Sequence, residues 1–180
     1  NACNPGDIIL TTGIHGLSKL GFMIKNKINF DKKISLTERL ISKAIKRFYR
    51  PEVYPNFLKN LLKTRSDKKI KRIGCTDSSD GLFQAIQDLA IASNCKAIID
   101  YEKIPKDKDW PTGDIWDEFY FFGGEDYELV FSLPKKWANN LSKLDKNIKE
   151  IGYFSYGEPS IEFKDNKNNE LLKKTPFKHF

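Results

Sequence analysis

The sequence predicts an α/β (α+β) domain in which a mixed sheet and helices form a two-layer sandwich. Short β-branched and apolar runs are mixed throughout the chain with segments whose apolar residues recur at helical spacing. Several helices are therefore available to cover a sheet. The 180 residues are enough for one domain with a sizeable core and too few for two comfortable ones.

The first part of the chain is predicted to form a strand and then helices. A turn cluster at 4–7 precedes residues 8–12, which are β-branched and apolar and so are typical of a buried strand. Glycines end this strand, and apolar residues then recur at helical spacing over 17–24. Ser35 and Glu38 form a predicted capping box at the start of the next helix.

The middle of the chain is also predicted to contain both helices and strands. The capped helix is expected to stop before Arg50-Pro51, and a short helix follows around 57–62. One helical stripe of apolar residues covers 82–93, and residues 97–100 have the composition of a strand. The apolar run 119–122 has the length of a strand and ends at two glycines.

The last part is predicted to begin with a strand at 129–133. Pro134 suits the first turn of a helix that carries apolar residues as far as 144. Two short strands, 151–154 and 160–163, precede a polar turn and the tail.

Composition favours a soluble, cytoplasmic protein. With 39% hydrophobic and 13% aromatic residues the chain is expected to be globular. No apolar run approaches the roughly 18–20 residues needed to cross a bilayer, and no signal-peptide pattern opens the chain, so no membrane partner is expected. Cys3, Cys75 and Cys95 are widely spaced and odd in number, which favours a reducing compartment over zinc or disulfides. Cys75 is expected to be a buried structural thiol.

The net charge of +7 is interpreted mainly as solvated surface. A patch that steers anionic substrates is the second interpretation. Nucleic acid is the least favoured partner, because the densest basic cluster, within residues 68–72, lacks interleaved aromatic residues.

The segment Asp77-Ser78-Ser79-Asp80-Gly81-Leu82 groups two carboxylates and two hydroxyls in a turn directly ahead of a predicted helix. Oxygen ligands of this kind suit Mg²⁺, and the N-terminal amides of the helix would favour a nearby phosphate. A simpler interpretation is that Ser79 or Asp80 only caps the helix. This segment by itself leaves both interpretations open.

A second segment, Gly123-Gly124-Glu125-Asp126-Tyr127-Glu128-Leu129, places three acids around a tyrosine. Acids this close are costly to bring together without a cation or a hydrogen-bonding ligand. The paired glycines permit tight backbone geometry or the close approach of a ligand. The alternative interpretation is an acidic surface hairpin.

Together the two segments resemble the thiamine-monophosphate kinase family, which lies within the superfamily of aminoimidazole ribonucleotide synthetase and selenophosphate synthetase. The resemblance extends nearly end to end, and two departures, Ser78 in place of an aliphatic residue and Lys96 in place of a glycine, remove no proposed ligand. Further matching residues are Pro5-Gly6-Asp7, Thr12-Gly13, Gly16, Ser18, Gly21, Arg50-Pro51, Ala92-Ser93, Ile104-Pro105 and Phe177-Lys178-His179-Phe180.

This resemblance implies ATP- and Mg²⁺-dependent phosphorylation of thiamine monophosphate to thiamine diphosphate, the last step of thiamine diphosphate biosynthesis. Residues 1–180 would be a single C-terminal substrate- and ATP-binding domain. The N-terminal ATP-binding domain, through which the family forms homodimers, would be absent from a chain that opens with Asn1 and reads as part of a longer polypeptide. We expect the chain alone to have little or no kinase activity.

The resemblance also implies the site residues. Asp77 and Asp80 would bind Mg²⁺, Ser79 would contact ATP, and Glu125 would contact thiamine monophosphate. Phe177 would lie beside the ring system of the substrate, since an aromatic ring suits a cationic thiazolium.

Other interpretations stay open. His179 is expected to pack or to form a hydrogen bond at the terminus, and His15, in the glycine turn, is given no role. The alternative functions are another ATP-dependent synthetase of the superfamily, a non-catalytic ligand-binding domain and, least favoured, a nucleic-acid-binding domain.

Overall fold

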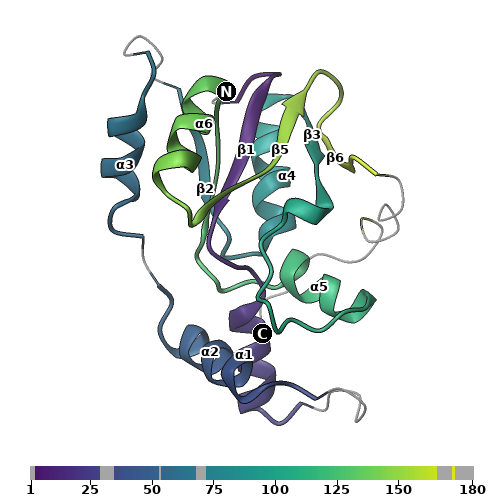
Figure 1. The fold of residues 1–180 in the computed structure, drawn as a ribbon. Coiled ribbons are helices and arrows are strands. Elements are labelled where there is room, and N and C mark those ends of the chain that lie inside the picture. Colours follow the sequence, from purple (N-terminus) through teal and green to yellow (C-terminus); the bar gives the residue numbers. More distant parts are fainter. Residues whose placement is uncertain (1–2, 29–34, 53, 68–71, 166–171, 173–180) are drawn as a thin grey trace.

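The computed structural model describes residues 3–28, 35–52, 54–67, 72–165 and 172. Its centre is a six-stranded sheet in the order β2-β4-β1-β5-β3-β6 (Figure 1). The strands are β1 (Asp7–Thr12), β2 (Gly74–Asp77), β3 (Lys96–Ile99), β4 (Leu129–Pro134), β5 (Ile148–Ser155) and β6 (Ser160–Phe163). Only the β3–β6 pair is parallel among the described strand pairs, and β1 pairs antiparallel with both β4 and β5. The sheet is therefore mixed, and the predicted α+β class is confirmed.

Six helices accompany the sheet in the part of the chain that the structure describes. They are α1 (Leu17–Lys25), α2 (Glu38–Tyr49), α3 (Phe57–Thr64), α4 (Leu82–Ser93), α5 (Asp114–Phe122) and α6 (Lys135–Leu144), with a short 3₁₀ turn, η1 (Tyr101–Lys103). Figure 1 shows α1, α2 and α5 beyond one end of the strands. The candidate site described below lies at this end.

Side chains of the sheet alternate between two hydrophobic clusters, as expected for a strand with both faces covered. Ile9 of β1 and Val130 of β4 pack in the larger cluster with residues of α1, α4 and α5. Their chain neighbours Leu10 and Phe131 belong to a second cluster, which contains residues of α3 and α6 such as Trp137. Helices therefore cover both faces of the central strands, so α3 and α6 extend the predicted sandwich by a further layer.

Helices α1 and α2 pack closely because of Gly21. A Cβ atom added at Gly21 would lie 2.2 Å from the carbonyl oxygen of Ala44, so any larger residue would push the two helices apart. Phe22 of α1 and Phe48 of α2 line a cavity of the candidate site described below.

The predicted start of α2 is wrong in its capping residue. The N-cap is Thr37, whose Oγ1 accepts a hydrogen bond from the Leu40 amide at 3.2 Å. An N-cap side chain reaches an amide two or three residues ahead, so a helix that begins at Glu38 is capped by Thr37 and not by Ser35.

The run 119–122 is also not a strand. It forms the end of α5, where Phe119, Tyr120, Phe121 and Phe122 are all buried. A helical segment that is buried on all sides shows no amphipathic period, so this short run could not be distinguished from a strand by its pattern.

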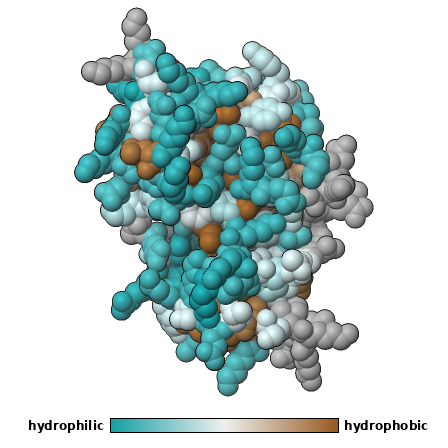
Figure 2. Space-filling view, viewed as in Figure 1, coloured by the Kyte–Doolittle hydropathy of each residue, from teal (hydrophilic) through white to brown (hydrophobic). Residues whose placement is uncertain are grey.

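The surface agrees with the composition. The face seen in Figure 2 is largely hydrophilic, with small separate hydrophobic spots. In the described ranges no helix has the length and apolar character that crossing a membrane requires.

Candidate functional site

The two motifs meet at one end of the β2–β4 pair. Asp77 ends β2, and its partner in the register is the first residue of β4. Beyond the strands, the Ser78 amide donates to the Glu128 carbonyl at 2.8 Å, and the Glu128 amide donates to Ser78 Oγ at 3.1 Å. The Glu125 amide donates to the Ser79 carbonyl at 2.8 Å. These three hydrogen bonds hold the first motif against the second.

This pairing brings the predicted ligands to one region of the surface. Asp77 is exposed, and Ser79, Asp80 and Glu125 are partly exposed. The Tyr127 hydroxyl donates to Glu125 Oε2 at 2.6 Å. That hydrogen bond, with the nearby charges of Glu125, Asp77 and Asp80, raises the pKa of Tyr127. The charges of all three carboxylates therefore act on the Tyr127 phenol.

The carboxylates fit a metal that takes further ligands from its substrates. Within the described ranges, no group of three or more His, Cys, Asp or Glu side chains is placed to hold an ion by itself. Mg²⁺ commonly binds through one or two carboxylates and completes its shell with water and phosphate oxygens. Asp77 and Asp80 are two carboxylates of the kind that such a site uses.

The start of α4 excludes the capping interpretation. Its N-cap is Gly81, with φ +95°, which has no side chain to form a cap hydrogen bond. Neither Ser79 nor Asp80 is therefore the N-cap residue. The Gly81 amide donates instead to the Ser78 carbonyl at 3.1 Å.

Two of the acids in the second motif are buried, so the acidic-hairpin interpretation is wrong. Asp126 is fully buried, and its carboxylate accepts hydrogen bonds from the Gly16 amide at 2.5 Å and the Ser18 amide at 2.9 Å. Burial outweighs these two hydrogen bonds and raises the pKa of Asp126 to about 7. Asp126 thereby ties the motif to the start of α1.

Glu128 forms the second buried anchor. Its carboxylate accepts from Thr12 Oγ1 at 2.5 Å and pairs with Arg47 Nη1 at 2.5 Å. Arg47 projects from α2 and is itself buried. Arg47 was not predicted from the sequence. The signal available was its helical spacing with the buried Leu40 and Ala44, which puts it on the inward face of α2.

The backbone conformation makes the side chains of this motif alternate between the surface and the interior. Glu125 and Tyr127 have left-handed φ angles of 67° and 54°. A residue other than glycine pays about 1–2 kcal/mol for this conformation. The cost is sustained because Asp126 and Glu128 are anchored on either side of Tyr127.

The histidine and the cysteine near the motifs have no catalytic geometry. His15 is fully buried, its Nε2 lies 2.6 Å from Thr11 Oγ1, and burial and then the Arg47 charge lower its pKa to about 3. Cys75, expected to be buried, is exposed in the outermost strand β2. Neighbouring residues partly desolvate its thiol, and this desolvation and then the charge of Asp77 raise the pKa of the thiol. The thiol therefore stays protonated.

An aromatic cavity of about 360 Å³ adjoins Glu125. Phe22 of α1 and Phe48 of α2 form one wall, with their ring centroids 5.8 Å apart. Glu125 and Tyr127 form the other, and Pro51 and Ser18 complete the lining. Phe177 and His179 lie outside the described residues, so the predicted ring contact of Phe177 stays a prediction.

Comparisons with known proteins agree with the motifs. The family described as AIR synthase related protein, C-terminal domain, matches residues 4–160. A thiamine-monophosphate kinase from Prochlorococcus marinus is 37% identical over 176 residues, which cover 98% of this chain and 53% of that relative. One from Buchnera aphidicola subsp. Schizaphis graminum is 31% identical over 191 residues, covering 100% and 54%. The chain thus spans about half the length of the curated relatives it matches.

A solved structure shows the same fold. AaThiL, complexed with AMPPCP and TMP, superposes with a TM-score of 0.73 at 24% identity, over 100% of this chain and 53% of that one. The resemblance inferred from the two motifs is confirmed by these matches.

Proposed function

Because the chain belongs to the AIR synthase related family and resembles thiamine-monophosphate kinases along its length, we propose that it is the C-terminal half of such a kinase. The complete protein would transfer a phosphoryl group from ATP to thiamine monophosphate and release ADP and thiamine diphosphate. AaThiL, complexed with an ATP analogue and TMP, supports the choice of substrates.

One observation carries this proposal. Asp77, Ser79, Asp80 and Glu125 come from two motifs far apart in the sequence, and three backbone-anchored hydrogen bonds bring those motifs together. Asp77 and Asp80 would hold Mg²⁺, which when bound would offset the negative charge of the two phosphate-bearing reactants. Ser79 would contact ATP.

Glu125 and the adjoining cavity would position the acceptor. Thiamine carries a cationic thiazolium, which suits a cavity with aromatic walls and one carboxylate. Phosphoryl transfer needs placement of the acceptor in line with the leaving group more than it needs a protein nucleophile. In agreement, the residues around the motifs offer carboxylates and hydroxyls for positioning.

The remaining features of the proposal concern the complete protein. It would be a cytoplasmic homodimer that associates through its N-terminal domain, and this 180-residue chain alone would have little or no activity. Robust turnover by the chain alone would contradict that expectation.

The test is ADP release by the complete protein with Mg-ATP, with and without thiamine monophosphate. Turnover should require thiamine monophosphate and fall by about 100-fold or more in Asp80→Ala, as on loss of a group that stabilises the transition state. Asp88→Ala is the matched control, because Asp88 is an exposed carboxylate of α4 outside the motif.

The other outcomes point to the alternatives. ATP turnover that does not respond to thiamine monophosphate would favour another ATP-dependent synthetase of the superfamily. A folded protein that binds ATP and shows no turnover would favour a non-catalytic ligand-binding domain.

A further inference from the structure

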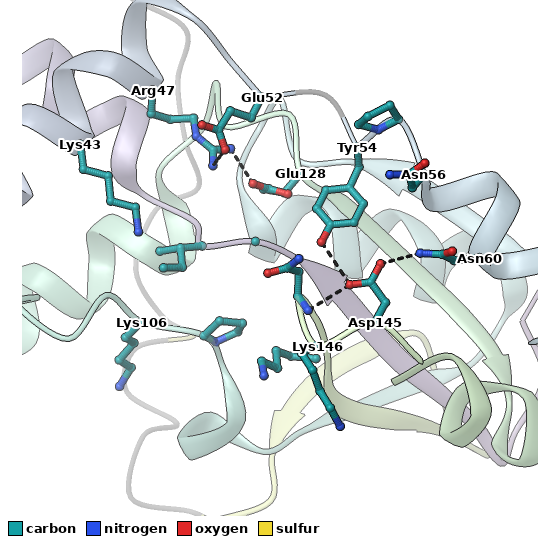
Figure 3. Close-up of a pocket in the computed structure, with 16 residues that line it drawn as sticks. Lys43, Arg47, Glu52, Tyr54, Asn56, Asn60, Lys106, Glu128, Asp145 and Lys146 are labelled. Carbon is teal, nitrogen blue, oxygen red and sulfur yellow. Dashed lines mark hydrogen bonds and ion pairs between the residues drawn. The ribbon is translucent and has the colours of Figure 1, made fainter. Parts of the chain in front are cut away.

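A second and larger cavity lies beside the candidate site, with a volume of about 650 Å³ (Figure 3). It shares Glu128 with the second motif, but its lining includes none of Asp77, Ser79, Asp80 or Glu125. Its walls come from the turn after β1, from α2, from the segment that joins α2 to α3 with the start of α3, from the residues after η1, and from the loop before β5 with the start of β5. The volume lies within the range of roughly 300–1,000 Å³ that is typical of small-molecule sites.

The acids that line this cavity are already occupied. Glu128 and Glu52 both pair with Arg47. Asp145 accepts hydrogen bonds from Asn60 Nδ2 at 2.9 Å and from the Tyr54 hydroxyl at 3.3 Å. Burial and then the charge of Asp145 raise the pKa of Tyr54 to about 12, so its hydroxyl remains a donor.

Three of the lysines that line the cavity have no carboxylate partner among the described residues. Lys43 pairs with Asp107 at 2.8 Å, but Lys106, Lys146 and Lys149 form no ion pair with any residue that the structure describes. Lys106 is held over the rings of Tyr101 and Tyr120, at 4.3 Å and 4.7 Å from their centroids. Figure 3 shows Lys43 and Lys106 at the left of the cavity, Glu128 and Tyr54 at the upper right, and Lys146 directly below Asp145.

We propose that this cavity is a second ligand site, which binds a phosphorylated small molecule. Lys106, Lys146 and Lys149 receive its phosphate groups, because the charges of three ammonium groups without a carboxylate partner in the described ranges outweigh the single carboxylate charge of Asp145. The opposite wall, with Tyr54 and Asn56, presents hydroxyl and amide groups to the polar remainder of the ligand. This site requires neither metal nor the chemistry proposed for the motifs.

The experiment is isothermal titration calorimetry of the protein with tripolyphosphate, at fixed ionic strength in a magnesium-free buffer with EDTA. Wild-type protein should bind one equivalent. The double variant Lys146→Gln/Lys149→Gln should bind about tenfold more weakly, as expected for the loss of two charged contacts. Lys135→Gln/Lys136→Gln removes the same charge from exposed positions in α6 outside the cavity, and should change the affinity less than about twofold.

Three results would overturn the proposal: no saturable binding, equal weakening by both double variants, or loss of binding in Asp80→Ala. The last would place the probe at the candidate active site. The assay contains no ATP, thiamine monophosphate or Mg²⁺, so its outcome is independent of whether the complete protein is a kinase.

Discussion

The four residues from Glu125 to Glu128 form two pairs with opposite surroundings. Glu125 and Tyr127 reach the surface, beside Asp77 and Asp80. Asp126 and Glu128 point inward, and their carboxylates are occupied by backbone amides, a hydroxyl and Arg47. Acids that are neighbours in the sequence therefore serve different purposes. The buried pair holds the loop, and the outer pair includes Glu125, which we propose contacts the acceptor.

This division predicts that changes to the buried pair act on stability and changes to the exposed pair act on ligands. The largest effect is expected for Arg47→Met, because it leaves Glu128 buried without its cation. We expect a loss of about 3–5 kcal/mol in the free energy of unfolding, measured by urea denaturation.

Two companion variants test the reason for that loss. Arg47→Met/Glu128→Leu should recover much of it, since no buried charge is then left alone. Lys46→Met, at the exposed neighbour of Arg47, should cost less than about 0.5 kcal/mol. If Arg47→Met behaves like Lys46→Met, the ion pair does not hold the loop.

The second effect concerns the amide that anchors Asp126. Gly16 has φ +84°, and a Cβ there would lie 2.6 Å from the Phe119 carbonyl oxygen. Gly16→Ala should therefore lower the free energy of unfolding by about 2–4 kcal/mol through strain and overpacking. Gly6 is the matched control, because its φ is +89° and nothing lies within 4 Å. Gly6→Ala should show only the backbone strain, about 1–2 kcal/mol. If the two variants lose the same free energy of unfolding, the clash with Phe119 does not contribute to the effect at Gly16.

The third effect is on the pH dependence of stability. The pKa of Asp126 is raised from 3.8 to about 7, so the native protein keeps a proton on Asp126 that the unfolded chain has already lost. The stabilisation from this proton is lost as the pH rises from 3.8 to about 7. The pKa of His15 is lowered from 6.5 to about 3, so its stabilisation is lost as pH falls from 6.5. The two contributions oppose each other between about pH 4 and pH 6.5.

Single variants should separate these slopes. Relative to wild type, Asp126→Asn should become more stable as pH rises from 4 to 7, and His15→Gln less stable as pH rises from 3 to 6.5. Each slope is limited to about 1.4 kcal/mol per pH unit, the value for one proton. Urea denaturation at several pH values measures them, and parallel curves for wild type and variant would show that the residue does not titrate as inferred.

The smallest effect on stability is expected at the exposed pair. Glycine adopts the left-handed conformation of Glu125 without steric cost, so Glu125→Gly should raise the free energy of unfolding by up to about 1 kcal/mol. The same variant should weaken the binding of thiamine monophosphate by the complete protein. Glu125→Gln keeps the side-chain size and should leave stability within about 0.5 kcal/mol. Destabilisation by Glu125→Gly would show that Glu125 is itself a structural residue.

Much of the fold could be predicted because its signals are local. The buried strand at 8–12 and the helix at 82–93 were recognised from composition and period, and the structure places β1 and α4 there. The errors arose where local signals conflict or vanish: Thr37 instead of Ser35 caps α2, and the fully buried run 119–122 is helical. Cys75 was expected to be buried, but its strand lies at the edge of the sheet.

The sequence by itself determined which residues could form the site, because Asp77, Ser79, Asp80 and Glu125 belong to motifs with ligand chemistry and turn-forming glycines. Only the tertiary structure decided which acids face outward. That choice depends on the pairing of β2 with β4, on Arg47 from α2 and on two left-handed residues, and each is set by partners distant in the chain. Local periodicity carries no information about such partners, because the energy of a buried ion pair or a strained φ angle is decided by the groups that surround it.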